Sequence, residues 1–147
     1  MTMYSTTRFA FQDTPLSKWK AVNLALECAV AARERFRREQ LQPAEEAFAT
    51  VRSQWPCESQ LREGSIAQIR IEAARAEFAP VQAEFDTLHR AVLDAADEAI
   101  ATPAPSMAAM AIKLRLLVED GCGSTRPHDE ILGILLADAR RLSGETV

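Results

Sequence analysis

Residues 71–99 read IEAARAEFAPVQAEFDTLHRAVLDAADEA, and this stretch decides the fold. Its apolar side chains recur at alternating steps of three and four positions: Ile71, Ala74, Phe78, Val81, Phe85, Leu88, Val92, Ala95 and Ala99. This seven-residue repeat is typical of long helices that pack against one another at a shallow angle. Extended to Ser65 and Thr102, it predicts one helix over about 65–102, roughly 55 Å long at 1.5 Å per residue.

Pro80 lies inside this predicted helix. A proline there removes the N–H that would bond to the carbonyl of Ala76, so we expect a kink. The apolar stripe keeps its phase on both sides of Pro80, which favours one bent helix over two separate ones.

The stretch that follows, ATPAPSMAAMAIKLRLL at residues 101–117, predicts a corner between two helices. Pro103 and Pro105 end the long helix, and Ser106 is a suitable cap for the next one. The apolar face expected for that next helix comprises Met107, Met110, Leu114, Leu117 and Val118. Gly121 and Gly123 should end it. Methionines at such a corner either fill the core or form an adaptable binding lip.

The N-terminal half predicts an irregular arm over 1–13 and then two helices. Asp13 or Thr14 can cap the first helix, and Pro15 suits its first position. Its apolar stripe comprises Leu16, Trp19, Val22, Leu26, Ala29 and Phe36. We expect this helix to end near Gln40, before Pro43, and a short helix to follow over about 44–54.

A last helix should begin at Pro127. Asp129 and Glu130 lie in its first turn and Arg140 and Arg141 in its last, where the helix dipole favours each sign. Its expected apolar face comprises Ile131, Leu132, Leu135, Ala139 and Leu142. The sequence therefore predicts one all-α domain over 1–147, a mainly antiparallel helical bundle of about five helices with one long Pro-kinked helix.

The segments TPAPSMAAMAIKLRLL and LLADARRL resemble the C-terminal part of small uncharacterised α-helical proteins of bacterial genomes, often prophage-associated. The resemblance covers about the last third of the chain. It implies a bacterial setting and brings no known activity, cofactor or site residue.

Composition places the chain among folded, non-membrane proteins. Hydrophobic residues make up 48% and charged residues 26%, and the start of the chain lacks a signal-peptide pattern. We therefore expect a cytoplasmic location. The three cysteines, Cys28, Cys57 and Cys122, form no C-x-x-C pair, and we expect them to be reduced, with Cys28 buried.

Catalytic motifs are missing from the sequence. The segment EDGCGST matches neither phosphate-loop pattern, and there is no G-x-S-x-G elbow. His89 follows Asp86 by three positions, a spacing that a di-iron bundle needs twice, and His128 lacks a convincing set of metal-ligand partners. We therefore expect no enzyme activity, no metal and no cofactor.

Two surfaces are predicted to bind partners. The segment RERFRREQ sets Arg33, Arg35, Arg37 and Arg38 around Phe36, either as a solvated helix end or as a contact for an acidic partner. Met107 and Met110 form the second candidate surface.

The heptad stripe is the candidate for self-association. The first helix would reach only about 39 Å, against roughly 55 Å for the long helix. The overhang, around Phe78, Val81, Phe85, Leu88 and Val92, could pair with a second copy as a homodimer, or the other helices could cover it within a monomer.

These features predict a non-catalytic accessory or regulatory protein that binds a protein partner through helix faces and self-associates. The alternative is a nucleic-acid-binding regulator that uses the arginine cluster.

Overall fold

The chain is all-α, as a computed structural model describes it over residues 14–55, 62–119 and 125–144. Five α-helices and one π-helix form in these residues, which contain no strand: α1 (Pro15–Phe36), η1 (Arg37–Leu41), α2 (Gln42–Ser53), α3 (Ile66–Ala101), α4 (Met107–Glu119) and α5 (His128–Ser143). The remaining residues, 1–13, 56–61, 120–124 and 145–147, are not described. They include the predicted N-terminal arm, Cys57, Cys122 and the predicted helix stops at Gly121 and Gly123.

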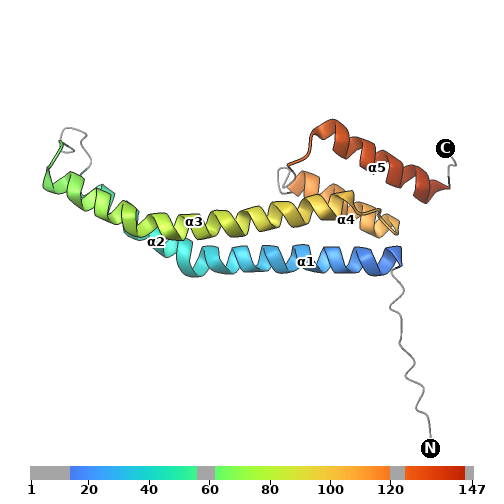
Figure 1. The fold of residues 1–147 in the computed structure, drawn as a ribbon, viewed down its shortest axis with the longest axis horizontal. Coiled ribbons are helices and arrows are strands. Elements are labelled where there is room, and N and C mark those ends of the chain that lie inside the picture. The colour runs from blue at the N-terminus through green and yellow to red at the C-terminus, as the bar shows by residue number, and fades with distance from the viewer. Residues whose placement is uncertain (1–13, 56–61, 120–124, 145–147) are drawn as a thin grey trace, which may run out of the picture.

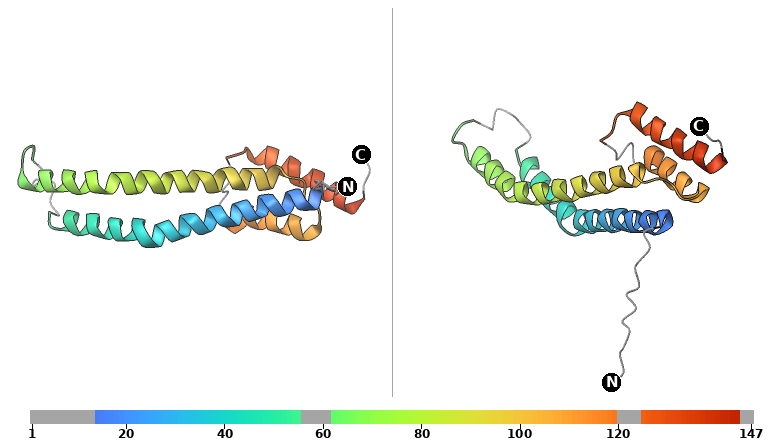
Figure 2. Two further views of the ribbon diagram at one scale, coloured as in Figure 1. Left: turned by 60° about the horizontal axis from the view of Figure 1, so that its bottom comes forward. Right: turned by 45° about the vertical axis from the view of Figure 1, so that its right-hand side comes forward.

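The helices do not form a five-helix bundle. α1, η1 and α2 join end to end into one rod that runs antiparallel to α3, and α4 and α5 gather at the end where α1 begins and α3 ends (Figures 1 and 2). The described chain is therefore a long helical hairpin with a two-helix head.

The start of α1 follows the sequence prediction. The Thr14 side chain accepts a hydrogen bond from the backbone N–H of Ser17, the Ser17 hydroxyl accepts one from the N–H of Thr14, and Pro15 takes the first helical position. This reciprocal arrangement uses two of the N–H groups that a helix start leaves unbonded.

The predicted helix end near Gln40 is wrong. The chain passes through a π-helical turn, in which the N–H of Gln42 donates to the carbonyl of Arg37, five residues earlier. The wider turn lets Pro43 enter the first turn of α2, where its missing N–H costs little. Because the first rod continues to Ser53, the length mismatch that favoured an unpaired overhang on α3 does not exist.

α3 has the predicted boundaries. Ser65 caps its start by accepting from the N–H of Gln68, and Thr102 is its C-cap. The helix is continuous through Pro80 and follows a curved path (Figure 2). Every residue of the heptad stripe is buried or half-buried.

The corner after α3 is also confirmed. The Ser106 hydroxyl accepts from the N–H of Ala109 at the start of α4, and Pro127 is the N-cap of α5. Two buried clusters form at this end of the hairpin. The cluster between α1 and α3 contains Leu26, Val92, Ala96 and Ala99. The cluster under α4 and α5 contains Trp19, Ile100, Ala104, Ala109, Met110, Ile131 and Leu135.

Cys28 corrects one expectation about the first rod, because it is exposed. Leu26 and the half-buried Ala29 and Val30 pack in the cluster against α3, so Cys28 is left on the outer side of α1. Leu16, expected on the buried stripe, is 49% exposed.

Candidate functional site

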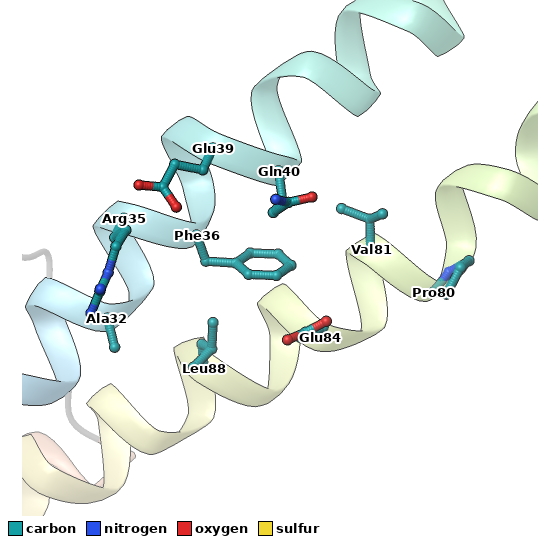
Figure 3. Close-up of a pocket in the computed structure, with 9 residues that line it drawn as sticks. All are labelled: Ala32, Arg35, Phe36, Glu39, Gln40, Pro80, Val81, Glu84 and Leu88. Atoms are coloured by element: carbon teal, nitrogen blue, oxygen red, sulfur yellow. The ribbon is translucent and has the colours of Figure 1, made fainter.

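A groove lies between the two rods where the first rod changes to π-helix (Figure 3). Its volume is about 490 Å³, and its lining residues are Ala32, Arg35, Phe36, Glu39, Gln40, Pro80, Val81, Glu84 and Leu88. It therefore joins part of the predicted arginine surface to part of the predicted stripe.

The groove has an apolar interior and a polar rim. Phe36 is half-buried, and its ring points into the space between the rods, where Val81 and Leu88 approach from α3 (Figure 3). Arg35 and Glu39 on one rod and Glu84 on the other are exposed charged side chains. Such a lining can hold an apolar side chain and pair with a charge beside it. None of its residues is a serine, cysteine or histidine.

The structure does not gather the four arginines of the predicted cluster on one face. Arg33 turns toward its neighbours, since its Nη2 lies 3.0 Å from a carboxylate oxygen of Glu34 and its Nη1 lies 3.4 Å from Nδ1 of His89 on α3. Arg35, Arg37 and Arg38 are exposed, and only Arg35 lines the groove.

The residues predicted for self-association pack within the chain. Phe78 stacks on Phe48 of α2, with ring centroids 5.7 Å apart, and Val92 is buried beside Leu26 of α1. Val81, Phe85 and Leu88 are half-buried. The first rod thus covers much of the stripe that was expected to overhang.

His89 and Asp86, whose spacing was compared with that of a di-iron bundle, each have another partner on α3. His89 stacks beside Phe85, whereas Asp86 accepts a hydrogen bond from Gln82. Nowhere in the described ranges do three or more His, Cys, Asp or Glu residues group so that they could hold a metal ion.

Among the described residues, the most buried ion pair lies inside the head, where Lys113 of α4 is fully buried. Its ammonium donates to the carbonyl of Ile100 at 2.7 Å and to Oδ2 of Asp138 at 2.6 Å, and it lies 5.7 Å from the centre of the Trp19 ring. These contacts engage the donors of the ammonium with a carbonyl, a carboxylate and an aromatic face.

Asp138 of α5 completes the Lys113–Asp138 cluster. Its two oxygens also accept from the backbone N–H of Ala104, each at 3.2 Å, and Oδ1 accepts from Nη2 of Arg141 at 2.8 Å. Nη2 of Arg141 also donates to the carbonyl of Ala104. Burial by itself raises the pKa of Asp138, but the hydrogen bonds from Lys113, Arg141 and Ala104 outweigh burial and hold that pKa below its ordinary value of 3.8.

This cluster sets which face of α4 points outward. Because Lys113 faces the interior, Ala109 and Met110 are buried with it, while Met107, Leu114 and Val118 are 67%, 46% and 81% exposed. The predicted apolar face of α4 is therefore wrong in part, and Met107 and Met110 do not share a surface. On α5, Leu132 was predicted to lie on the buried face, but it is 65% exposed.

Sequence reasoning missed Lys113 and Asp138 because it places charged side chains at the surface. A signal was present in their spacing. Lys113 follows Ala109 and Met110 by four and three positions, and Asp138 follows Leu135 by three, so charges of opposite sign occupy the apolar faces of two neighbouring helices.

Searches of protein-family models, of curated proteins and of solved structures gave no significant match to this chain. In the described residues, no helix combines the length and the apolar character that a membrane span requires.

Replacing Lys113 with Met should lower the free energy of unfolding by about 3 kcal/mol, because it leaves the buried Asp138 without its main partner. Combining Lys113→Met with Asp138→Leu should recover at least about 1 kcal/mol of that loss, since an apolar pair avoids the cost of a buried charge. Urea unfolding followed by circular dichroism measures both. The exposed control Lys20→Met should stay within about 0.5 kcal/mol of wild type. Equal effects of Lys113→Met and Lys20→Met would contradict the assigned role of the cluster.

Asp138 should also give the protein an acid-sensitive stability. Its folded pKa lies below 3.8, so its stabilising effect is complete above the unfolded pKa and is lost as the pH falls through the folded pKa. Between about pH 5 and pH 2, the unfolding free energy of Asp138→Asn should therefore fall less steeply than that of wild type. The exposed control Asp94→Asn should run parallel to wild type. Parallel curves for Asp138→Asn and wild type would disprove the linkage.

Proposed function

We propose that this chain is a non-catalytic accessory or regulatory protein that binds protein partners through helix faces, and in the first place a second copy of itself. The outward row of α4 carries the proposal. Met107, Leu114 and Val118 are large apolar side chains that are 67%, 46% and 81% exposed, on a helix whose opposite side is buried.

The spacing of this row suits helix-to-helix recognition. Leu114 and Val118 follow Met107 by seven and eleven positions. The exposed Ala111 lies between Met107 and Leu114, four positions after Met107. Rows with such spacing are the anchors that amphipathic helices present to a partner. In an antiparallel pairing of two α4 helices about a two-fold axis, Met107 of one copy would face Val118 of the other, so the row matches itself.

The same end of the molecule offers more apolar surface on α5. Leu132 and Leu136 are 65% and 51% exposed. Contiguous exposed apolar surface commonly marks an interaction site, because water contact with it is unfavourable. The proposal also includes a cytoplasmic location and a bacterial, prophage-associated origin for this protein.

Size-exclusion chromatography with light scattering tests the self-association. Wild type should give a species of about 32 kDa, twice the 16.2 kDa chain, and Leu114→Asp should give a monomer, because it places a charge at the centre of the row. The matched control is Ile69→Asp, a 58% exposed position at the far end of α3, which should remain dimeric. A monomeric wild type, or a dimeric Leu114→Asp, would contradict this interface.

A nucleic-acid-binding role is the second candidate, and the exposure of three arginines favours it. Arg35, Arg37 and Arg38 are exposed, and none of them pairs with a carboxylate of the described residues. Such side chains are available to phosphates, and binding through them would weaken steeply with salt.

Titration of a fluorescent DNA duplex at about 50 and 200 mM salt tests this role. If it is correct, replacing Arg35, Arg37 and Arg38 with Gln should weaken binding about tenfold or more and flatten the salt dependence. The control replaces three exposed arginines of α3 with Gln: Arg70, Arg75 and Arg90. Equal weakening by both triple variants would show only an effect of net charge and would reject the arginine cluster as a site.

A further inference from the structure

A second cavity lies at the head, between the first turn of α1, the corner after α3 and the last turns of α5. Its volume is about 630 Å³, and it is lined by Thr14, Pro15, Lys18, Thr102, Pro103 and Arg141. This volume falls within the usual range of small-molecule sites. The cavity is separate from the groove at Phe36 and from the outward row of α4.

The lining of this cavity is positively charged. Lys18 and Arg141 come from helices far apart in sequence, and no lining residue is acidic. Lys18 is exposed, and its ammonium has no partner among the described residues. The first turn of α1 borders the cavity and adds the positive end of a helix dipole.

Arg141 is held in place while most of its donors stay available. Its contacts with Oδ1 of Asp138 and with the carbonyl of Ala104 are both made by Nη2. Nη1 and Nε make no hydrogen bond within the described chain, and the side chain is 48% exposed. A guanidinium fixed on one side can bind an anion on the other with little loss of side-chain entropy.

We propose that this cavity binds a small organic phosphate. A phosphate monoester carries nearly two negative charges at neutral pH and offers three acceptor oxygens, so it can bridge Lys18 and Arg141. Pro15 and Pro103 provide apolar surface for the organic part of the ligand. This inference does not depend on the proposed self-association.

Isothermal titration calorimetry of the full chain tests the proposal, with inorganic phosphate, AMP and citrate as probes at low salt. AMP should bind with a Kd below about 1 mM and more tightly than inorganic phosphate, because only AMP has an organic part to contact the prolines. Lys18→Glu should weaken AMP binding at least about tenfold, since it places a repelling charge at the phosphate. Lys20→Glu makes the same charge change at an exposed position of α1 that does not line the cavity, and it should change AMP binding less than about twofold.

Three results would overturn the proposal. Absence of heat with AMP shows that the cavity takes no organic phosphate. Equal weakening by Lys18→Glu and Lys20→Glu shows that binding follows net charge alone. Citrate binding as tightly as AMP assigns the cavity to carboxylates. Neither lysine variant should unfold at a lower temperature than wild type, because neither side chain makes a described contact that the fold requires and an acidic residue is favourable near the start of α1.

Discussion

The head of this protein depends on one buried ion pair, Lys113 with Asp138. The pair is costly to desolvate, and further hydrogen bonds offset that cost: Lys113 also donates to a carbonyl, and Asp138 also accepts from a backbone N–H and a guanidinium. Lys113 bonds the carbonyl of Ile100 near the end of α3, where helix carbonyls lack intrahelical donors. Asp138 takes the N–H of Ala104, in a corner that helical hydrogen bonds do not cover. Three helices and the corner between two of them are thus joined at one place.

The ion pair has a consequence for the molecular surface. α4 has 13 residues and many apolar side chains, but only one of its sides packs against the rest of the head. The inward Lys113 decides which side that is. The buried side combines small and flexible residues, Ala109 and Met110, with Lys113. Larger apolar residues remain in water as a result, and that arrangement is the physical basis for proposing an interface there.

The π-helical turn has a comparable effect at the other end of the hairpin. One wider turn carries the first rod past Pro43 and sets the phase of α2, so that Phe48 meets Phe78 of α3. Its residues Glu39 and Gln40 also line the groove around Phe36, and π-helical turns are frequent at functional positions. The π-helical turn contains Arg37 and Arg38 of the proposed nucleic-acid surface, and the inward Lys113 lies on the same helix as the outward apolar row.

Sequence alone determined the features that depend on neighbouring residues. The heptad stripe specified α3 from about Ser65 to Thr102. Ser106 specified the start of α4, and the start of α1 was specified to within one residue, Asp13 or Thr14, because period and capping are local properties. The tertiary structure decided what depends on residues far apart in the chain. Lys113 and Asp138 are 25 positions apart, and hydropathy assigns each to the surface until the other is beside it. Such distant contacts, which no periodicity encodes, also decide three other features. They are the outward face of α4, the cavity between Lys18 and Arg141, and the packing of the first rod over the heptad stripe.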